Sequence, residues 1–214
     1  MIKAALFDLD GTLANTMEDL ADAVNYALEK HGYPPRSLDQ FNHMIGDGAA
    51  VMLTRALPPE KRSPENAALL LPDFLSYYGG HFMDKTYVYN GIPELLSELK
   101  GRGLRLAVVT NKVHKMALML VARLFPDTFD LVLGQQEGIP VKPDPALMRL
   151  ATEKLGAEGG QCVFIGDSGV DMRTALNGGA LPIGVTWGFR GKDELRENGA
   201  KHIVTAPGEI LDLI

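Results

Sequence analysis

The sequence predicts an α/β fold, built on a doubly wound and mostly parallel sheet with an inserted helical cap domain. Two observations lead to this prediction. Short apolar runs alternate with stretches of helical periodicity over most of the chain, which is typical of a parallel sheet with helices on both faces. Between Thr16 and Thr86 this alternation stops, and only helical patterns remain. We therefore expect a Rossmann-like core that is interrupted early by a separate helical unit.

The strands of the core are expected where short apolar runs are bounded by turn residues. Such runs are typical of strands that are buried on both faces of a parallel sheet. The clearest runs lie at residues 4–9, 104–110, 162–166 and 182–186, and weaker ones lie at 131–134 and 202–204. Together they indicate an open sheet.

The core helices are expected between these strands, where apolar residues recur with the helical period. The stretches are 93–100, 113–125, 145–155, 169–177 and 192–198. Pro93 and Pro145 would stand in the first turns of their helices, where a missing N–H costs no hydrogen bond. Strand and helix thus alternate, as they do in doubly wound folds.

The segment 16–86 is expected to form the cap. Thr16 resembles a helix N-cap, with Asp19 as an acid in the first turn. Helical patterns cover 19–30, 49–57 and 65–83, and the proline-containing stretches 32–37 and 57–65 are expected to connect them. We therefore predict two domains, a core of residues 1–15 and 87–214 and a cap of residues 16–86.

The composition indicates a globular protein without an extended basic surface. A net charge of −6, with 46% apolar and 22% charged residues, provides no footprint for nucleic acid or for an anionic membrane. No run of 18 apolar residues occurs, and the apolar stretch in MIKAALFDLD is too short for a signal peptide. The single cysteine, Cys162, is expected to be a buried thiol. We expect a cytoplasmic protein, and the sequence does not indicate an oligomeric state.

Acidic residues follow two of the expected strands, at the edge of the sheet where the carboxyl ends of parallel strands meet. Open α/β sheets bind their ligands at this edge. Asp8 and Asp10 end the first strand and leave it on the same side, because strand side chains alternate. Asp167 and Asp171 follow a later strand and would add negative charge. Carboxylates this close repel one another, and a hard divalent cation such as Mg²⁺ relieves the repulsion.

Two of these acidic positions also have simpler interpretations. The dipeptide Asp10-Gly11 favours hairpin turns, but the residues after it, TLANTMEDLADA, have a helical pattern, so no partner strand is expected. Asp171 is interpreted equally well as an ordinary first-turn acid of the helix that follows Gly169.

Two further polar residues come from the same edge of the expected sheet. Lys142 would add a positive charge, and Thr110 would add a hydroxyl donor of the kind that holds a phosphoryl oxygen. With the acids and Mg²⁺, this set fits a phosphate group held beside a metal ion.

Four motifs occur in order along the chain: DLDGT at 8–12, TN at 110–111, KP at 142–143 and GDSGVD at 166–171. In these motifs the chain resembles the haloacid dehalogenase-like phosphohydrolases, and the resemblance covers essentially its whole length. The segment between the first two motifs resembles the helical cap of one subgroup of that family.

The resemblance implies a role for each acid. Asp8 would be the nucleophile that becomes an aspartyl phosphate, and Asp10 would protonate the leaving oxygen and then activate water. Mg²⁺ would be held by the Asp8 carboxylate, the Asp10 backbone carbonyl and Asp167. Asp171 would support the metal site, directly or through water.

The resemblance also implies how the phosphoryl group is held. Thr110 and Lys142, with Asn111 in the same motif as the threonine, would bind it. Ser168 stands where threonine is common in the family, and this difference leaves a hydroxyl in place.

Within the family, the chain is most similar to phosphoglycolate phosphatases and related phosphatases of small substrates. The stretches that carry this similarity are IGDGAAVMLTRAL at 45–57, VVTNK at 108–112, VTWGFRG at 185–191 and GAKHIV at 199–204. Asp47 in the cap would repel a substrate carboxylate unless Arg55 or Arg190 compensates its charge. We expect these three residues to take part in substrate selection.

The function expected from the sequence is Mg²⁺-dependent hydrolysis of a small phosphorylated metabolite, with 2-phosphoglycolate favoured. Pyrophosphate, a nucleotide and a sugar phosphate remain alternative substrates within the same class. A receiver module, which is phosphorylated on aspartate and acts as a switch, is the alternative from another class. Two features oppose it: receivers resemble compact domains without a helical insert, and their phosphorylated aspartate does not stand two residues before a second acid.

Overall fold

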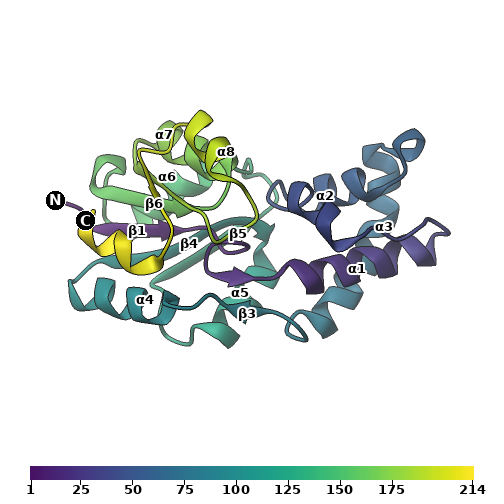
Figure 1. Cartoon of the computed structure of the whole chain (residues 1–214), viewed down its shortest axis with the longest axis horizontal. Helices are drawn as coiled ribbons and strands as arrows, with labels where there is room; N and C mark the ends of the chain where they lie inside the picture. Colours follow the sequence, from purple (N-terminus) through teal and green to yellow (C-terminus); the bar gives the residue numbers. More distant parts are fainter.

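A six-stranded parallel sheet forms the centre of the computed structural model, which describes residues 1–214 (Figure 1). Its strands are β1 (Ala4–Phe7), β4 (Arg105–Val113), β5 (Leu131–Gln135), β6 (Cys162–Gly166), β7 (Leu181–Val185) and β8 (His202–Val204). They lie in the order β5-β4-β1-β6-β7-β8, and every neighbouring pair is parallel. The predicted fold class and all six predicted strands are confirmed.

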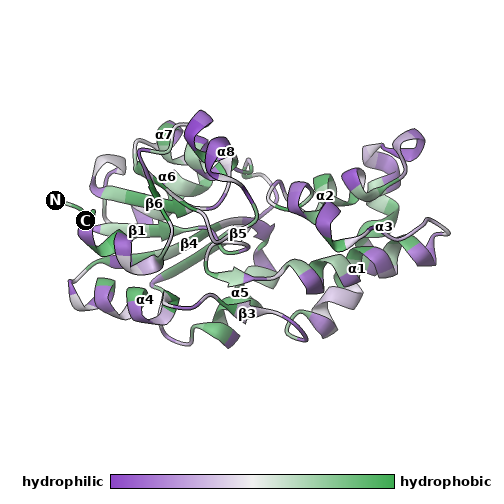
Figure 2. Ribbon diagram, in the orientation of Figure 1, coloured by the Kyte–Doolittle hydropathy of each residue, from purple (hydrophilic) through white to green (hydrophobic).

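Helices cover both faces of this sheet (Figure 1), and the central strands are apolar (Figure 2). Successive side chains of a strand point to opposite faces of the sheet. Ala5 and Phe7 of β1 therefore pack on one face, and Ala4 and Leu6 pack on the other. The first face is covered by α4 (Ile92–Gly101) and α5 (His114–Leu124), and the second by α6 (Ala146–Leu155) and α7 (Gly169–Gly178). α8 (Lys192–Glu197) contacts β7 and β8, and short 3-10 helices occupy Gly159–Gln161 and Pro207–Asp212.

Strand β4 is longer than the sequence predicts. We expected it to end at residue 110, but it continues to Val113. Its pairing with β5 shifts register between Val109 and Val113, where Val113 pairs with Gln135. An irregularity of this kind bends a strand and re-aims its side chains. The residues expected after the strand therefore belong to its last, irregular part.

The second structural unit is a helical bundle beside the carboxyl-terminal edge of the sheet (Figure 1). It contains α1 (Met17–Lys30), α2 (Ala49–Ala56) and α3 (Pro64–His81), with 3-10 helices at Leu38–His43 and Pro59–Lys61. These elements bury a separate apolar cluster that includes Leu28, Leu53 and Phe74. All three predicted helices are present. The division into domains at residues 15/16 and 86/87 stays a prediction. None of the helices in the structure is both long and apolar enough to cross a membrane.

Two chain segments connect the bundle to the sheet and pair with each other. β2 (Ala14–Asn15) runs antiparallel to β3 (Tyr87–Val88). The expectation that a helix follows Gly11 directly was wrong, because α1 begins only at Met17 and Ala14–Asn15 has a partner strand. Hydrogen bonding between two distant segments decides this local structure.

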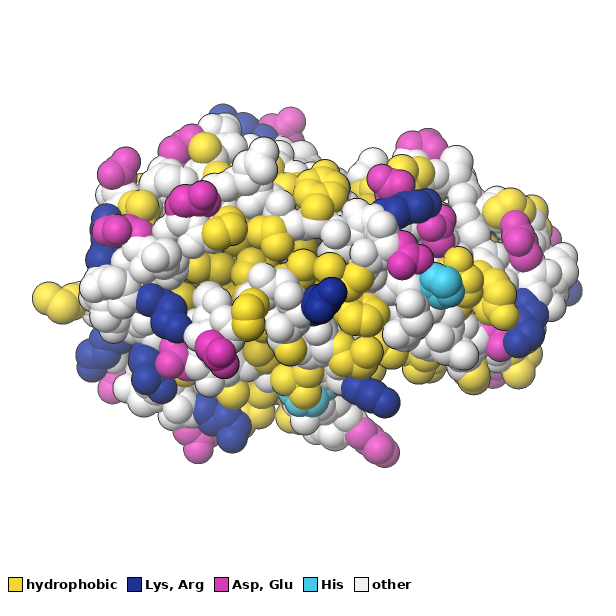
Figure 3. All heavy atoms as spheres, turned by 90° about the horizontal axis from the view of Figure 1, so that it is seen from below, with side chains coloured by type: hydrophobic (Ala, Val, Ile, Leu, Met, Phe, Trp, Pro, Cys, Tyr) yellow, Lys and Arg dark blue, Asp and Glu magenta, His cyan; other side chains and the backbone are white.

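Aromatic side chains gather close to these connections. Tyr87, Tyr89, Trp187 and Pro207 line a shallow hollow, and Tyr87 is more than half exposed. The face seen in Figure 3 carries hydrophobic side chains at its centre and charged groups mainly around its margin. This face therefore presents apolar as well as charged surface.

Asp19, in the first turn of α1, holds the returning connection in place. Its carboxylate is buried and accepts hydrogen bonds from the backbone N–H of Lys85 at 3.0 Å and of Thr86 at 2.9 Å. The sequence analysis placed Asp19 in the first helical turn, which is confirmed. In addition, its side chain joins the returning connection to the start of α1.

Asp19→Ala is expected to destabilise the protein by about 1–3 kcal/mol, because it leaves backbone N–H groups without their acceptor. The matched control is Asp22→Ala on the same helix, which removes an exposed ion pair with Lys85 and should cost at most about 1 kcal/mol. Urea unfolding of both variants measures the difference. Equal small losses would show that the Asp19 contacts do not stabilise the connection.

Candidate active site

Three carboxylates meet at the carboxyl-terminal edge of the sheet. Asp8 follows β1, Asp167 follows β6, and Asp171 lies in the first turn of α7. One oxygen from each lies within 4.8 Å of the others, and all three side chains are buried. Strand ends and a helix start thus bring Asp8 together with two acids that lie more than 150 residues later in the sequence.

Lys142 is the cation inside this cluster. Its Nζ lies 2.8 Å from Asp8 Oδ1 and 2.7 Å from Asp171 Oδ1, and its side chain is 1% exposed. Burial by itself would lower the pKa of Lys142. The negative charges of Asp171 and Asp8 have the larger combined effect and raise the pKa above its ordinary value. Lys142 is therefore a fixed positive charge.

Asp171 has hydrogen-bond partners on both carboxylate oxygens. Besides the contact with Lys142, its Oδ2 accepts from Ser168 Oγ at 2.6 Å and from the Ser168 backbone N–H at 3.1 Å. Ser168 Oγ accepts in return from the Asp171 N–H, which completes a capping box at the start of α7. The interpretation as a first-turn acid is confirmed, and the metal-supporting role stays a prediction.

The acids are not fully neutralised by Lys142. Burial raises the pKa of Asp8 to about 6, with Lys142 opposing the shift and the charge of Asp171 adding to it. Burial also raises the pKa of Asp167, and repulsion from Asp171 and Asp8 raises it further. A second positive charge would relieve this repulsion. Buried carboxylate oxygens are the donors that hard divalent cations prefer, so the cluster fits such a cation.

The backbone closes tightly on Asp167. Asp167 Oδ2 accepts from the Phe189 N–H at 2.7 Å, and Oδ1 accepts from Thr12 Oγ1 at 3.3 Å. Gly11 has a φ of +86°, and a Cβ atom on Gly11 or on Gly188 would overlap the Asp167 side chain. Both glycines are needed for the two loops to approach this close.

Asp10 is held by a different set of residues. Its Oδ1 accepts from Thr16 Oγ1 at 2.7 Å, and the Lys112 Nζ lies 2.9 and 3.1 Å from its two oxygens. Thr16 is in the N-cap position of α1, but its side chain makes no cap hydrogen bond. Thr16 therefore orients Asp10 instead of closing the helix end.

Lys112 and Tyr78 belong to the site, although the sequence analysis did not assign them to it. The Lys112 side chain is 5% exposed, and its Nζ lies 4.7 Å from the centre of the Tyr78 ring on α3. Lys112 could have been found, since it lies two positions after Thr110 and strand alternation favours the same side for both. Nothing local marks Tyr78, because it is one of several aromatic residues on its helix.

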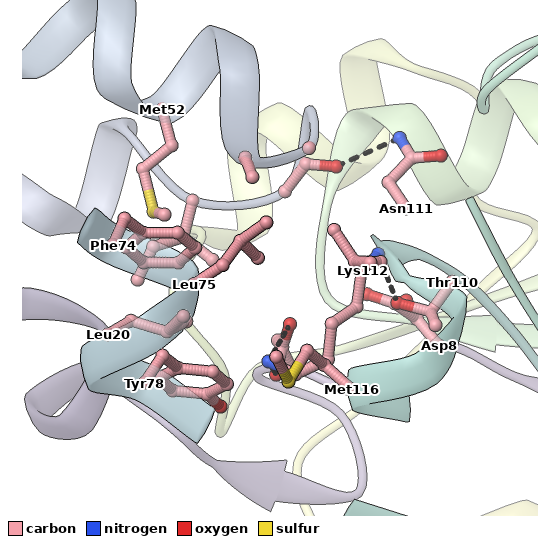
Figure 4. Close-up of a pocket in the computed structure, with 16 residues that line it drawn as sticks. Asp8, Leu20, Met52, Phe74, Leu75, Tyr78, Thr110, Asn111, Lys112 and Met116 are labelled. Atoms are coloured by element: carbon pink, nitrogen blue, oxygen red, sulfur yellow. Dashed lines mark hydrogen bonds and ion pairs between the residues drawn. The ribbon is translucent and has the colours of Figure 1, made fainter. Parts of the chain in front are cut away.

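A pocket opens between these groups and the helical bundle (Figure 4). Asp8, Thr110 and Lys112 line it from the sheet side. The bundle contributes apolar and aromatic residues, namely Leu20, Ile45, Met52, Phe74, Leu75 and Tyr78. The sheet domain thus supplies the charges, and the bundle supplies an apolar wall.

Asn111 joins the two sides of this pocket. Its amide nitrogen donates to the carbonyls of Gly46 and Lys142, both at 3.0 Å, and its Oδ1 accepts from the Lys142 N–H at 2.8 Å. These contacts link the bundle loop at Gly46 to the backbone that carries Lys142. Phosphate binding by Thr110 and Asn111 stays a prediction.

The three residues expected to select the substrate do not line the pocket, although Asp47 stands between the lining residues Gly46 and Gly48. Arg55 Nη1 is 2.5 Å from Asp47 Oδ2, so Arg55 compensates the charge of Asp47. Arg190 Nη2 donates to the Ile45 carbonyl at 2.9 Å, and its Nε is 3.4 Å from a Glu194 oxygen. Their roles in selection stay predictions.

Comparison with protein families identifies this architecture. The model of the haloacid dehalogenase-like hydrolases matches residues 5–185. The chain belongs to this family. The match includes every acid of the cluster, and the predicted family resemblance is confirmed.

Two relatives align with the whole chain. A phosphoglycolate phosphatase of Chromobacterium violaceum is 33% identical over 100% of this chain and 96% of its own length. An N-acetylmuramic acid 6-phosphate phosphatase of Pseudomonas aeruginosa is 32% identical over 100% and 95%. A crystal structure described as a predicted phosphoglycolate phosphatase of Haemophilus somnus has 30% identity and a TM-score of 0.90, covering 99% of this chain and 97% of that chain.

The metal-free protein is expected to lose stability as the pH rises from about 5 to about 7. The pKa of Asp8 is about 6 in the fold against 3.8 ordinarily, so the folded state keeps a proton that the unfolded state has released. This contribution is complete below the unfolded pKa and is lost as the pH passes the folded one. With a chelator present, the melting temperature of wild type relative to Asp8→Asn should therefore fall by a few degrees over this range.

Addition of Mg²⁺ at neutral pH should reverse the loss in wild type and act less on Asp8→Asn, which lacks one carboxylate. A melting-temperature difference that stays constant across this pH range would contradict the raised pKa of Asp8.

Proposed function

We propose that this chain is a phosphatase that hydrolyses small phosphate monoesters through an aspartyl phosphate on Asp8, and that 2-phosphoglycolate is its substrate. The arrangement around Asp8 carries the proposal. A buried carboxylate is held by Lys142 beside Asp167, and the second acid Asp10 opens onto the same pocket. These are the parts that nucleophilic phosphoryl transfer needs.

In the proposed reaction, a carboxylate oxygen of Asp8 attacks phosphorus and the ester oxygen leaves. Asp10, oriented by Thr16, donates a proton to that oxygen and then takes one from the water that hydrolyses the aspartyl phosphate. Lys142 stabilises the charge that collects on the phosphoryl oxygens. Thr110 and Asn111 would hold these oxygens in place.

The residues that would hold a metal are the Asp8 and Asp167 carboxylates and the backbone carbonyl of Asp10. The family and the acid cluster support a divalent cation, and we propose Mg²⁺ because all these donors are oxygens. When bound, the ion supplies positive charge that reduces repulsion between the Asp8 carboxylate and the phosphate.

The names of the relatives support a substrate that is both a phosphate ester and a carboxylic acid. Phosphoglycolate and N-acetylmuramic acid 6-phosphate share these two groups. We favour phosphoglycolate because several relatives are named phosphoglycolate phosphatase. The apolar side chains of the bundle also line the pocket that Asp8 lines, which favours a small substrate. An acidic sugar phosphate is the second candidate. A cytoplasmic location is part of this proposal.

The test is steady-state release of phosphate from 2-phosphoglycolate. Wild type with Mg²⁺ should release many equivalents per molecule, and Asp8→Asn should lower the rate by at least about 10³-fold, because an amide is a poor nucleophile. Asp212→Asn, an exposed position, is the matched control. Release of a single equivalent would favour the receiver alternative, and full activity in Asp8→Asn, once deamidation is excluded, would disprove the mechanism.

Asp10→Asn should separate substrates by their leaving groups. On alkyl phosphates, which need a proton on the leaving oxygen, the rate should fall by about 10²–10⁴-fold. On p-nitrophenyl phosphate, whose leaving group is stable as an anion, the fall should be smaller. Equal losses on both substrates would rule out Asp10 as the acid.

A further inference from the structure

An acidic leaving group poses an electrostatic problem in this pocket. 2-Phosphoglycolate carries its carboxylate two bonds from the ester oxygen, so this second anion must enter the space between the sheet domain and the bundle. The bundle wall is apolar there, and a buried carboxylate without a partner is costly. Some group in the pocket must therefore compensate the charge.

Lys112 is the only basic residue among the sixteen that line the pocket. The other candidate cations are placed differently. Lys142 lies between Asp8 and Asp171, and Arg55 is paired with Asp47 outside the lining. Arg190 also lies outside the lining, although its Nη1 is buried without a hydrogen-bond partner.

The Lys112 ammonium is placed where it can bind an anionic group of the leaving alcohol. Asp10, the proposed proton donor to the ester oxygen, is its ion-pair partner at 2.9 Å. The Tyr78 ring lies on its other side, at the apolar wall (Figure 4). An anion held close to the leaving oxygen is therefore within reach of this side chain, and Thr16 still holds Asp10 when Lys112 turns away.

We propose that Lys112 binds the carboxylate of the leaving group and thereby selects phosphate monoesters that carry an acid next to the ester. This inference rests on the proposed phosphatase function and names the residue that recognises the acid. Lys112 then has two partners in turn: Asp10 in the free enzyme and the substrate carboxylate in the complex.

The test compares 2-phosphoglycolate with 2-hydroxyethyl phosphate, in which a hydroxymethyl group replaces the carboxylate. The measured quantity is the ratio of the two kcat/KM values. Wild type should prefer phosphoglycolate by at least about 10-fold, the size of one charge-assisted hydrogen bond. Lys112→Met should slow both esters, because Lys112 also contacts Asp10, but the ratio should fall by about 10- to 100-fold.

Two variants complete the design. Lys112→Arg keeps the charge and should keep most of the preference. Lys115→Met, an exposed position on α5, is the matched control and should leave the ratio unchanged. If Lys112→Met does not fold, Lys112→Gln replaces it, with the same fall in the ratio expected.

Each contrary outcome has a definite meaning. No preference in wild type, an unchanged ratio in Lys112→Met, or loss of the preference in Arg190→Met but not in Lys112→Met would overturn the role of Lys112. If wild type hydrolyses neither ester with Mg²⁺ present, the proposed function fails and the inference falls with it. Hydrolysis of both esters at ratios independent of Lys112 leaves the phosphatase function intact and refutes only the inference.

Discussion

The buried ammonium of Lys142 touches Asp8 and Asp171, and through them it joins the end of β1, the start of α7 and the loop before α6. Removing one member of such a contact leaves an uncompensated charge, at a typical cost of about 3–5 kcal/mol. The cluster is still short of positive charge, because it contains three acids and Lys142 pairs with only two of them. Buried contacts therefore hold the site rigidly, but the site lacks positive charge. In the proposed function a divalent cation supplies this charge, so that the cation and a phosphate bind together.

The bundle is connected to this rigid centre mostly through backbone groups. Asp19 binds the N–H groups of Lys85 and Thr86, and Asn111 and Arg190 bind the carbonyls of one loop at residues 45–46. Contacts to the backbone do not depend on which side chains the loop carries. These backbone contacts therefore do not depend on the side chains of the apolar wall, whereas Tyr78 of that wall contacts Lys112, the ion-pair partner of Asp10.

Much of the fold followed from the sequence because its signals are local. Buried parallel strands are continuous apolar runs, and the acids stand at their ends, so β1, β6 and the cluster were predictable. The parts that were missed depend on distant partners. The strands β2 and β3 have two residues each, too few for a period, and exist because two connections pair. Thr16 occupies the N-cap position as predicted, but its hydroxyl donates to Asp10 instead of capping the helix.

The net charge of −6 is compatible with the proposed anionic substrate, because what matters is where the charges lie and not their sum. Surface charges are screened by salt over about 10 Å, so most of the acidic excess acts weakly at the pocket. Lys112 lines the pocket and Lys142 lies beside it between Asp8 and Asp171, and both are buried, where screening by water and salt is weak. Each is paired with an aspartate that takes part in the proposed reaction. In the proposed reaction, Lys112 exchanges Asp10 for the carboxylate of the substrate, so its buried ammonium keeps an anionic partner throughout.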